Sequence, residues 1–177
     1  MKMNLPNILS ISRILLLIPI IFLFELGWHL SSTFVFVIAA ITDFLDGYFA
    51  RKNNQTSDSG ALLDLLADKL FVSILLIWIT YNFNDIAILI SSILIISREI
   101  SISYLRMYLL SLSGEIKEIK SDKIGKYKTA TQMIGLGLIL ASPLTPNFIF
   151  NLSLILIFFS ALISWYSLIK YLNKWIV

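Results

Sequence analysis

Six long apolar stretches, separated by short polar segments, constrain the fold of this 177-residue chain more than any other feature. A helix needs about 20 residues to cross the hydrocarbon core of a bilayer. Hydrophobic residues make up 58% of the chain and charged residues only 14%, whereas soluble domains have about 45–50% and about 25%. The sequence therefore predicts an all-α, polytopic membrane protein in which residues 1–177 form a single membrane domain with six transmembrane helices. The predicted spans are residues 10–28, 30–51, 60–81, 85–112, 126–145 and 147–172.

The chain contains no cysteine and a single histidine, His29. Disulfides, thiolate zinc sites and cysteine nucleophiles are therefore excluded, and so is a metal site with several histidine ligands. His29 falls in a predicted linker, away from the other charges, and we interpret it as a surface residue. Any chemistry must come from carboxylates, lysines and arginines, hydroxyls, amides or a bound ion.

Basic residues are distributed unevenly between the apolar stretches. The linkers near 25–32, 82–86 and 142–148 contain no lysine or arginine, whereas the opposite set of segments holds ten of the fourteen basic residues. Because short basic loops of membrane proteins stay in the cytoplasm, both termini are predicted to lie there. The net charge of +3 suits a cytoplasmic face that lies on anionic lipid, and it is not a signal for nucleic-acid binding.

Four aspartates lie inside the second and third apolar stretches, where exposure to lipid would be costly. Asp43 and Asp46 are three residues apart, and Asp64 and Asp68 are four apart. Each pair is then separated by roughly 60° or 40° around a helix and presents two carboxylates from one face. The polar segment 51–59 is short, so the two helices are expected to be antiparallel neighbours with their acids at similar depth. Oxygen ligands without histidine or cysteine favour Mg²⁺ or Mn²⁺ over Zn²⁺, which predicts a site for one or two divalent cations.

Two other interpretations of the acids stay open. They could form structural ion pairs with nearby basic residues, although two carboxylate pairs on one face exceed what simple pairing needs. They could also belong to a small cation transporter, although acids along a pore would be spread through the membrane and these cluster at one end. Gly47, Ala50 and Gly60 on the same helices would let a bulky ligand approach the backbone, although helix packing is the commoner role of small residues.

The pattern of these two helices resembles the signature of the CDP-alcohol phosphatidyltransferases. The chain reads Asp43-Phe-Leu-Asp46-Gly47-Tyr-Phe-Ala50-Arg51, then eight residues, then Gly60-Ala-Leu-Leu-Asp64-Leu-Leu-Ala-Asp68. Every fixed position of the family pattern D-x2-D-G-x2-A-R-x8-G-x3-D-x3-D is present, and the predicted six-span layout matches as well. Segments 4–13, 97–100 and 125–132 are similar to motifs of the bacterial phosphatidylglycerophosphate synthase branch of this family.

The resemblance implies that a phosphatidyl group is transferred from CDP-diacylglycerol, with release of CMP, at the cytoplasmic face of a bacterial cell membrane. Mg²⁺ or Mn²⁺ would be held by Asp43, Asp46, Asp64 and Asp68. By its position in the motif, Asp68 would also be the general base that takes the proton of the acceptor hydroxyl. The CDP-diacylglycerol head group would be bound by Asn7, Gly47, Ala50, Arg51 and Gly60.

The same resemblance implies glycerol 3-phosphate as the acceptor and phosphatidylglycerophosphate as the product. Arginine suits bidentate phosphate binding, and the acceptor phosphate is expected to meet Arg98, Arg106, Lys126, Lys128 and Gln132. Other acceptors of the family stay open, namely inositol phosphate, serine or phosphatidylglycerol. An acceptor without phosphate would have less use for two arginines in a span. Glu99 lies seven residues before Arg106, on nearly the same helix face, and is expected to orient it. The expected partners are the two substrates, membrane lipids and, as the family suggests, a second copy of the chain in a homodimer.

Overall fold

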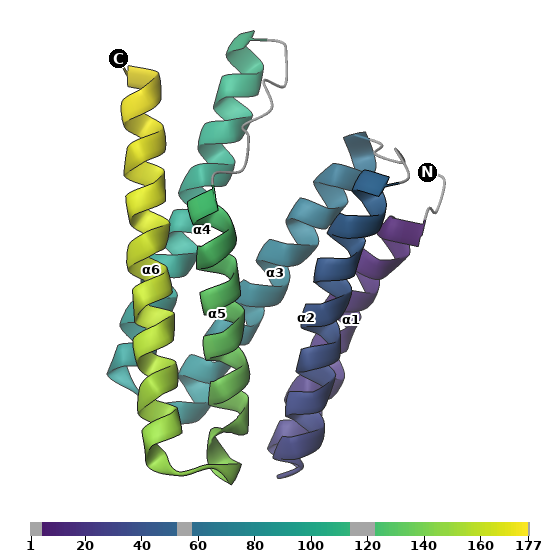
Figure 1. Cartoon of the computed structure of the whole chain (residues 1–177), viewed down its shortest axis with the longest axis vertical. Coiled ribbons are helices and arrows are strands. Elements are labelled where there is room, and N and C mark those ends of the chain that lie inside the picture. The colour runs from purple at the N-terminus through teal and green to yellow at the C-terminus, as the bar shows by residue number, and fades with distance from the viewer. Residues whose placement is uncertain (1–4, 53–57, 114–122, 177) are drawn as a thin grey trace.

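The computed structural model describes residues 5–52, 58–113 and 123–176, and these residues form six α-helices, one 3₁₀ turn and no strand. The prediction of an all-α fold is therefore confirmed (Figure 1). The elements are α1 (Leu5–Glu25), α2 (His29–Lys52), α3 (Asp58–Phe83), α4 (Ile86–Ser113), α5 (Lys123–Ala141), η1 (Ser142–Leu144) and α6 (Asn147–Ile176).

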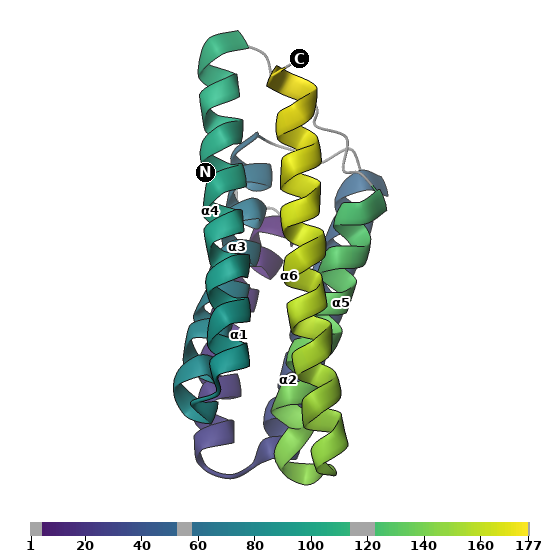
Figure 2. The ribbon, with the colours of Figure 1, turned by 90° about the vertical axis from the view of Figure 1, so that its left-hand side faces the viewer.

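Successive helices run in opposite directions, so that the first and last described helical turns lie at the same end of the bundle (Figure 1). α1 packs against both α2 and α3, while α6 packs against α5 and α4. The views in Figures 1 and 2 agree that α6 lies beside α4 and α5. Contacts of α2 with α5 and of α3 with α4 join the two halves.

Short turns at the opposite end fix the antiparallel order. Gly27, between α1 and α2, has φ of 79°, and its N–H donates to the Phe24 carbonyl at 2.9 Å. Glycine reaches this left-handed conformation at no steric cost, which is why it commonly ends a helix. Before α4, the Asp85 Oδ1 accepts hydrogen bonds from the backbone N–H groups of Ala87 and Ile88 at 2.7 and 3.2 Å. An aspartate in this place satisfies N–H groups that have no partner within the helix.

Among the described residues, a buried apolar cluster draws members from all six helices. In it the Phe36 and Phe71 rings stack with centroids 6.1 Å apart, which ties α2 to α3. A Cβ added at Gly135 would stand 2.6 Å from Ile157 Cγ1, so the glycine permits the close approach of α5 and α6. Small residues allow such close packing of membrane helices.

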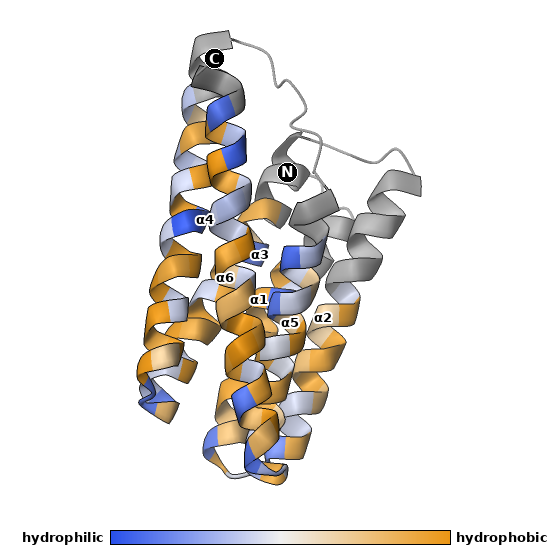
Figure 3. Cartoon of the chain, turned by 60° about the vertical axis from the view of Figure 1, so that its left-hand side comes forward, coloured by the Kyte–Doolittle hydropathy of each residue, from blue (hydrophilic) through white to orange (hydrophobic). Residues whose placement is uncertain are grey.

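The outer surface of the bundle is also apolar, and orange apolar segments cover the middle of the helices in Figure 3. Large side chains such as Ile18, Phe34, Ile77 and Ile155 are more than half exposed. Within the part of the chain that is described, three segments are long and apolar enough to cross a membrane: Leu65–Phe83, Ile86–Leu105 and Asn147–Asn173. The chain is therefore an all-α membrane protein. The count of six spans stays a prediction.

Candidate active site

The four acidic residues of the signature lie on the parts of α2 and α3 nearest the segment that joins them. Asp46 lies six residues before the end of α2 and Asp64 six residues after the start of α3. Asp43 and Asp68 lie nine and ten residues from the same ends. At about 1.5 Å per residue, the acids form two levels about 9 Å and about 14 Å along the helices. The helix bounds thus place the acids of α2 and those of α3 at similar distances from the segment that joins the two helices.

The packing of α2 and α3 differs in one respect from the expected arrangement. The two helices are antiparallel, but each makes its main contacts with α1. A short connection places helix ends together, yet it does not stop a third helix from filling the angle between them. The acid-bearing region is therefore built from three helices, α1 included.

Arg13 is the contribution of α1 to this region. Its side chain is 1% exposed and forms an ion pair with Asp68, whose side chain is 43% exposed. Arg13 was not among the predicted site residues, although it ends the segment 4–13 that is similar to a family motif. The sequence feature that could have identified Arg13 is its position within the first predicted span, where an ionisable residue implies a partner or a function.

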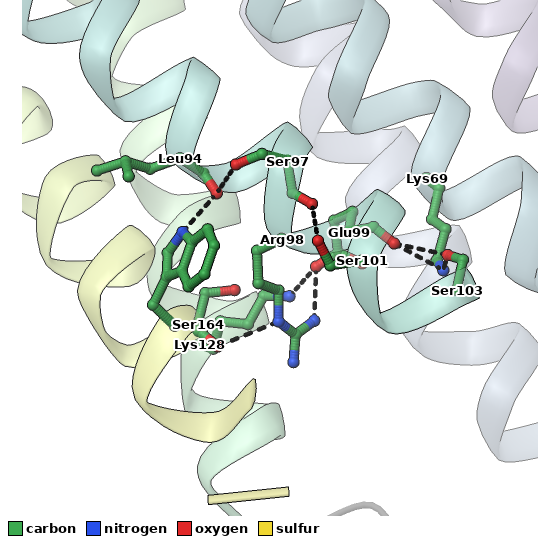
Figure 4. A network of polar contacts seen from close by, with 10 residues as sticks. Lys69, Leu94, Ser97, Arg98, Glu99, Ser101, Ser103, Lys128 and Ser164 are labelled. Atoms are coloured by element: carbon green, nitrogen blue, oxygen red, sulfur yellow. Dashed lines mark hydrogen bonds and ion pairs between the residues drawn. The ribbon is translucent and has the colours of Figure 1, made fainter. Parts of the chain in front are cut away.

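A second polar group lies where α4, α5 and α6 meet, and Figure 4 shows it at close range. The Arg98 Nη1 donates to Glu99 Oε1 at 2.8 Å, and its Nε donates to the Ser164 carbonyl of α6 at 3.1 Å. The Lys128 Nζ from α5 forms an ion pair with the same Glu99 Oε1. The three charged side chains are only 10–16% exposed. We call Arg98, Glu99 and Lys128 the basic cluster.

Lys69 connects the two regions. It follows Asp68 in α3, and its Nζ donates to the Ser103 hydroxyl and, at 3.4 Å, to the Glu99 carbonyl. Asp68 thus pairs with α1 while its chain neighbour reaches α4 and the basic cluster. Asp68 is therefore adjacent in sequence to a residue, Lys69, that contacts the predicted acceptor site.

Three of the five residues predicted for the acceptor site have described side chains, and their role as an acceptor site stays a prediction. Arg98 and Lys128 share Glu99, and Gln132, one turn after Lys128, is 4% exposed. The side chains of Arg106 and Lys126 lie outside the described residues, so the expected help of Glu99 to Arg106 stays a prediction. Glu99 was predicted only as a partner of Arg106, and Ser164 was not predicted. Ser164 contributes its backbone carbonyl oxygen, a contact that the residue type does not indicate.

Most of the predicted donor site lies outside the side chains that the structure describes. This applies to Asn7, Asp43, Asp46, Gly47, Ala50, Arg51, Gly60 and Asp64, and these assignments stay predictions. Among the described side chains there is no group of three or more histidines or acids that could hold a metal ion. Asp68 is the one signature acid in that set. The donor set of four carboxylates without histidine or cysteine fits a hard divalent cation.

Comparison with known proteins agrees with the signature. Residues 3–169 match the model of the CDP-alcohol phosphatidyltransferase family. The CDP-diacylglycerol–glycerol-3-phosphate 3-phosphatidyltransferase of Haemophilus influenzae is 39% identical over 98% of this chain and 94% of its own. The proteins of the same name from Salmonella typhimurium and Shigella flexneri are 33% and 31% identical, over 98% of this chain and 95% of theirs. The chain belongs to the CDP-alcohol phosphatidyltransferase family.

Proposed function

We propose that this protein transfers the phosphatidyl group of CDP-diacylglycerol to glycerol 3-phosphate, forming phosphatidylglycerophosphate and CMP. One observation carries the choice of acceptor: Arg98 and Lys128, on different helices, converge beside the acid-bearing helix α3. A buried pair of cations suits a phosphate dianion. The relatives that match nearly the whole chain are named for the same reaction.

The signature acids provide the donor side of this reaction. Asp43, Asp46, Asp64 and Asp68 would hold Mg²⁺ or Mn²⁺ beside the pyrophosphate. A bound divalent cation neutralises charge on the pyrophosphate and on the departing CMP. Gly47, Ala50 and Gly60 leave space for the nucleotide, and Asn7 and Arg51 add polar contacts to it.

Asp68 provides the proton acceptor. The acceptor hydroxyl oxygen attacks the phosphorus that carries the diacylglycerol, the bond from this phosphorus to the bridging oxygen breaks, and CMP leaves with that oxygen. The hydroxyl proton passes to the Asp68 carboxylate. Arg13 holds this carboxylate from the side of α1. The partial exposure of Asp68 keeps it within reach of a substrate.

The basic cluster provides the acceptor side, together with Arg106, Lys126 and Gln132. Its cations bind the phosphate of glycerol 3-phosphate and leave the distal hydroxyl free to approach Asp68. Serine carries no phosphate group that these cations could bind. Family membership favours a transferase over the cation transporter that the acids alone left open.

Removal of Arg98 tests this division of roles. We expect Arg98→Ala to weaken the use of glycerol 3-phosphate by about 2–5 kcal/mol, because a phosphate contact and the buried partner of Glu99 are both lost. Binding of CDP-diacylglycerol should be almost unchanged, since Arg98 contacts α6 and Glu99. The measurement is KM and kcat for each substrate with purified protein. Lost donor binding with intact acceptor affinity would contradict the assignment.

The orientation follows from the charge asymmetry. We propose that both termini, the signature acids and the basic cluster face the cytoplasm of a bacterial cell, and that the protein acts as a homodimer. Single cysteines placed at Lys52 and Lys120 should react with an impermeant maleimide only from the cytoplasmic side, and a cysteine at His29 only from outside. Labelling of position 29 from the cytoplasm would contradict the six-span topology.

Product analysis tests the reaction itself. Purified protein in mixed micelles with CDP-diacylglycerol receives radiolabelled glycerol 3-phosphate, inositol phosphate, serine or phosphatidylglycerol in separate reactions. We expect labelled phosphatidylglycerophosphate and stoichiometric CMP from the first acceptor only. A labelled lipid from another acceptor, with none from glycerol 3-phosphate, would move the protein to another branch of the family.

A further inference from the structure

Glu99 is the acidic residue on which the basic cluster is organised. A single carboxylate oxygen, Oε1, accepts the hydrogen bonds of Arg98 and Lys128, which come from α4 and α5. The backbone oxygen of the same residue accepts Lys69 of α3. The Glu99 side chain is 16% exposed. One residue thus gathers three cations from three helices at a mostly buried place.

The basic cluster contains more positive than negative side chains. Arg98 and Lys128 share the single carboxylate of Glu99, and a cationic cluster of this kind suits a phosphate ligand. Because buried cations require partners, Glu99 keeps the two cations together at the place where the acceptor phosphate is proposed to bind.

The hydrogen bonds of Arg98 also determine which of its nitrogen atoms face a ligand. Arg98 is held through Nη1 by Glu99 and through Nε by the Ser164 carbonyl. No described residue accepts a bond from its Nη2, which points away from both partners in Figure 4. A guanidinium fixed on two sides presents its Nη2 donors in one direction, and binding then costs little ordering of the side chain.

We propose that Glu99 is a positioning residue for the acceptor phosphate: it holds Arg98 and Lys128 in the arrangement that binds the dianion, and it takes no part in proton transfer. This inference rests on the proposed function. A purely structural role, in which Glu99 only fastens α4 to α5, is the competing explanation. The two explanations differ in what its removal does to the two substrates.

The chain offers a matched control at the other end of the bundle. Glu25 Oε1 accepts the Trp78 Nε1 and Asn82 Nδ2 of α3, each at 3.0 Å. It is also a carboxylate that joins two helices through two donors to one oxygen, and it lies away from the proposed site. Glu25→Ala therefore measures the effect of losing an interhelical carboxylate as such.

The test compares Glu99→Ala, Glu99→Gln and Glu25→Ala in mixed micelles, at concentrations corrected for folded protein. We expect Glu99→Ala to raise the KM for glycerol 3-phosphate at least about tenfold and to leave the KM for CDP-diacylglycerol within about twofold. Glu99→Gln should show a smaller rise, because its amide oxygen still accepts both bonds. Glu25→Ala should change neither KM. If Glu99→Ala fails to fold, Glu99→Gln carries the comparison.

A double-mutant cycle on the acceptor KM tests whether Glu99 acts through Lys128, while the comparison of donor and acceptor KM separates positioning from a purely structural role. If Glu99 acts through Lys128, then Glu99→Ala should raise the acceptor KM less in a Lys128→Ala background than in the wild-type chain. The proposal is overturned if the two effects add, or if donor and acceptor KM rise together. It is also overturned if Glu99→Ala lowers the acceptor KM, which would make Glu99 a competing anion.

Failure of the proposed function would appear separately, in the wild-type enzyme. A wild type that ignores glycerol 3-phosphate refutes the proposed acceptor before any variant is compared. The same variants are then assayed with the phosphate-bearing acceptor that the enzyme does use. A protein that uses no acceptor with a phosphate overturns the role of Glu99 as well.

Discussion

Asp68→Asn is expected to lower turnover by about 10²–10⁴-fold. Asparagine keeps the shape of the side chain and an oxygen that accepts the hydrogen bond of Arg13. It cannot take a proton from the acceptor hydroxyl at neutral pH. The loss should therefore fall on kcat, while CDP-diacylglycerol still binds. Single-turnover formation of CMP and equilibrium binding of the donor measure the two quantities.

The control for this variant must separate a lost base from a lost ion pair. Arg13 is buried and loses a charged partner in Asp68→Asn, so the thermal midpoint is measured alongside activity. Asp85→Asn is the matched exchange, because Asp85 caps α4 at the far end of the bundle and asparagine caps a helix equally well. It should leave turnover unchanged. Recovery of wild-type turnover by Asp68→Asn on raising Mg²⁺ would mean that Asp68 is a metal ligand only.

The helices were predictable from the sequence because a bilayer leaves the backbone few alternatives. Inside lipid every N–H and C=O must be satisfied within the segment, so a long apolar run becomes a helix. The predicted span 85–112 differs from α4 by one residue at each end. The predicted start at residue 10 was five residues late for α1, because hydropathy marks the lipid core and does not mark where a helix begins.

The residue types of the site were also predictable, whereas their partners were not. Helix periodicity tells which residues share a face, and it placed Glu99 near Arg106, seven positions later. The structure pairs Glu99 with Lys128, 29 residues away, and Asp68 with Arg13, 55 residues away. These pairs depend on which helix packs opposite. That choice is made by the packing of apolar surfaces, including the close contact at Gly135, and not by the charged residues themselves.

Removal of divalent cations is expected to abolish activity, because the donor side brings anions together. Without a divalent cation, Asp43, Asp46, Asp64 and Asp68 would face a pyrophosphate with only Arg13 and Arg51 to compensate the negative charge. Two unit charges 4 Å apart repel by about 4 kcal/mol at an effective dielectric constant of 20. Protein dialysed against EDTA should therefore form no CMP, and added Mg²⁺ or Mn²⁺ should restore the reaction.

Asp43→Asn gives the same argument a residue-level test. A residue that only holds the cation should, when changed, weaken donor binding and shift the Mg²⁺ dependence to higher concentration, with partial recovery at saturating Mg²⁺. This is the opposite of the behaviour expected of Asp68→Asn, whose defect should persist at any Mg²⁺ concentration. Donor binding measured by equilibrium dialysis with and without Mg²⁺ provides a readout that does not depend on turnover. Full turnover in excess EDTA, after bound metal has been removed, would refute the cation site, and the acids would then have to be neutralised by protein cations such as Arg13.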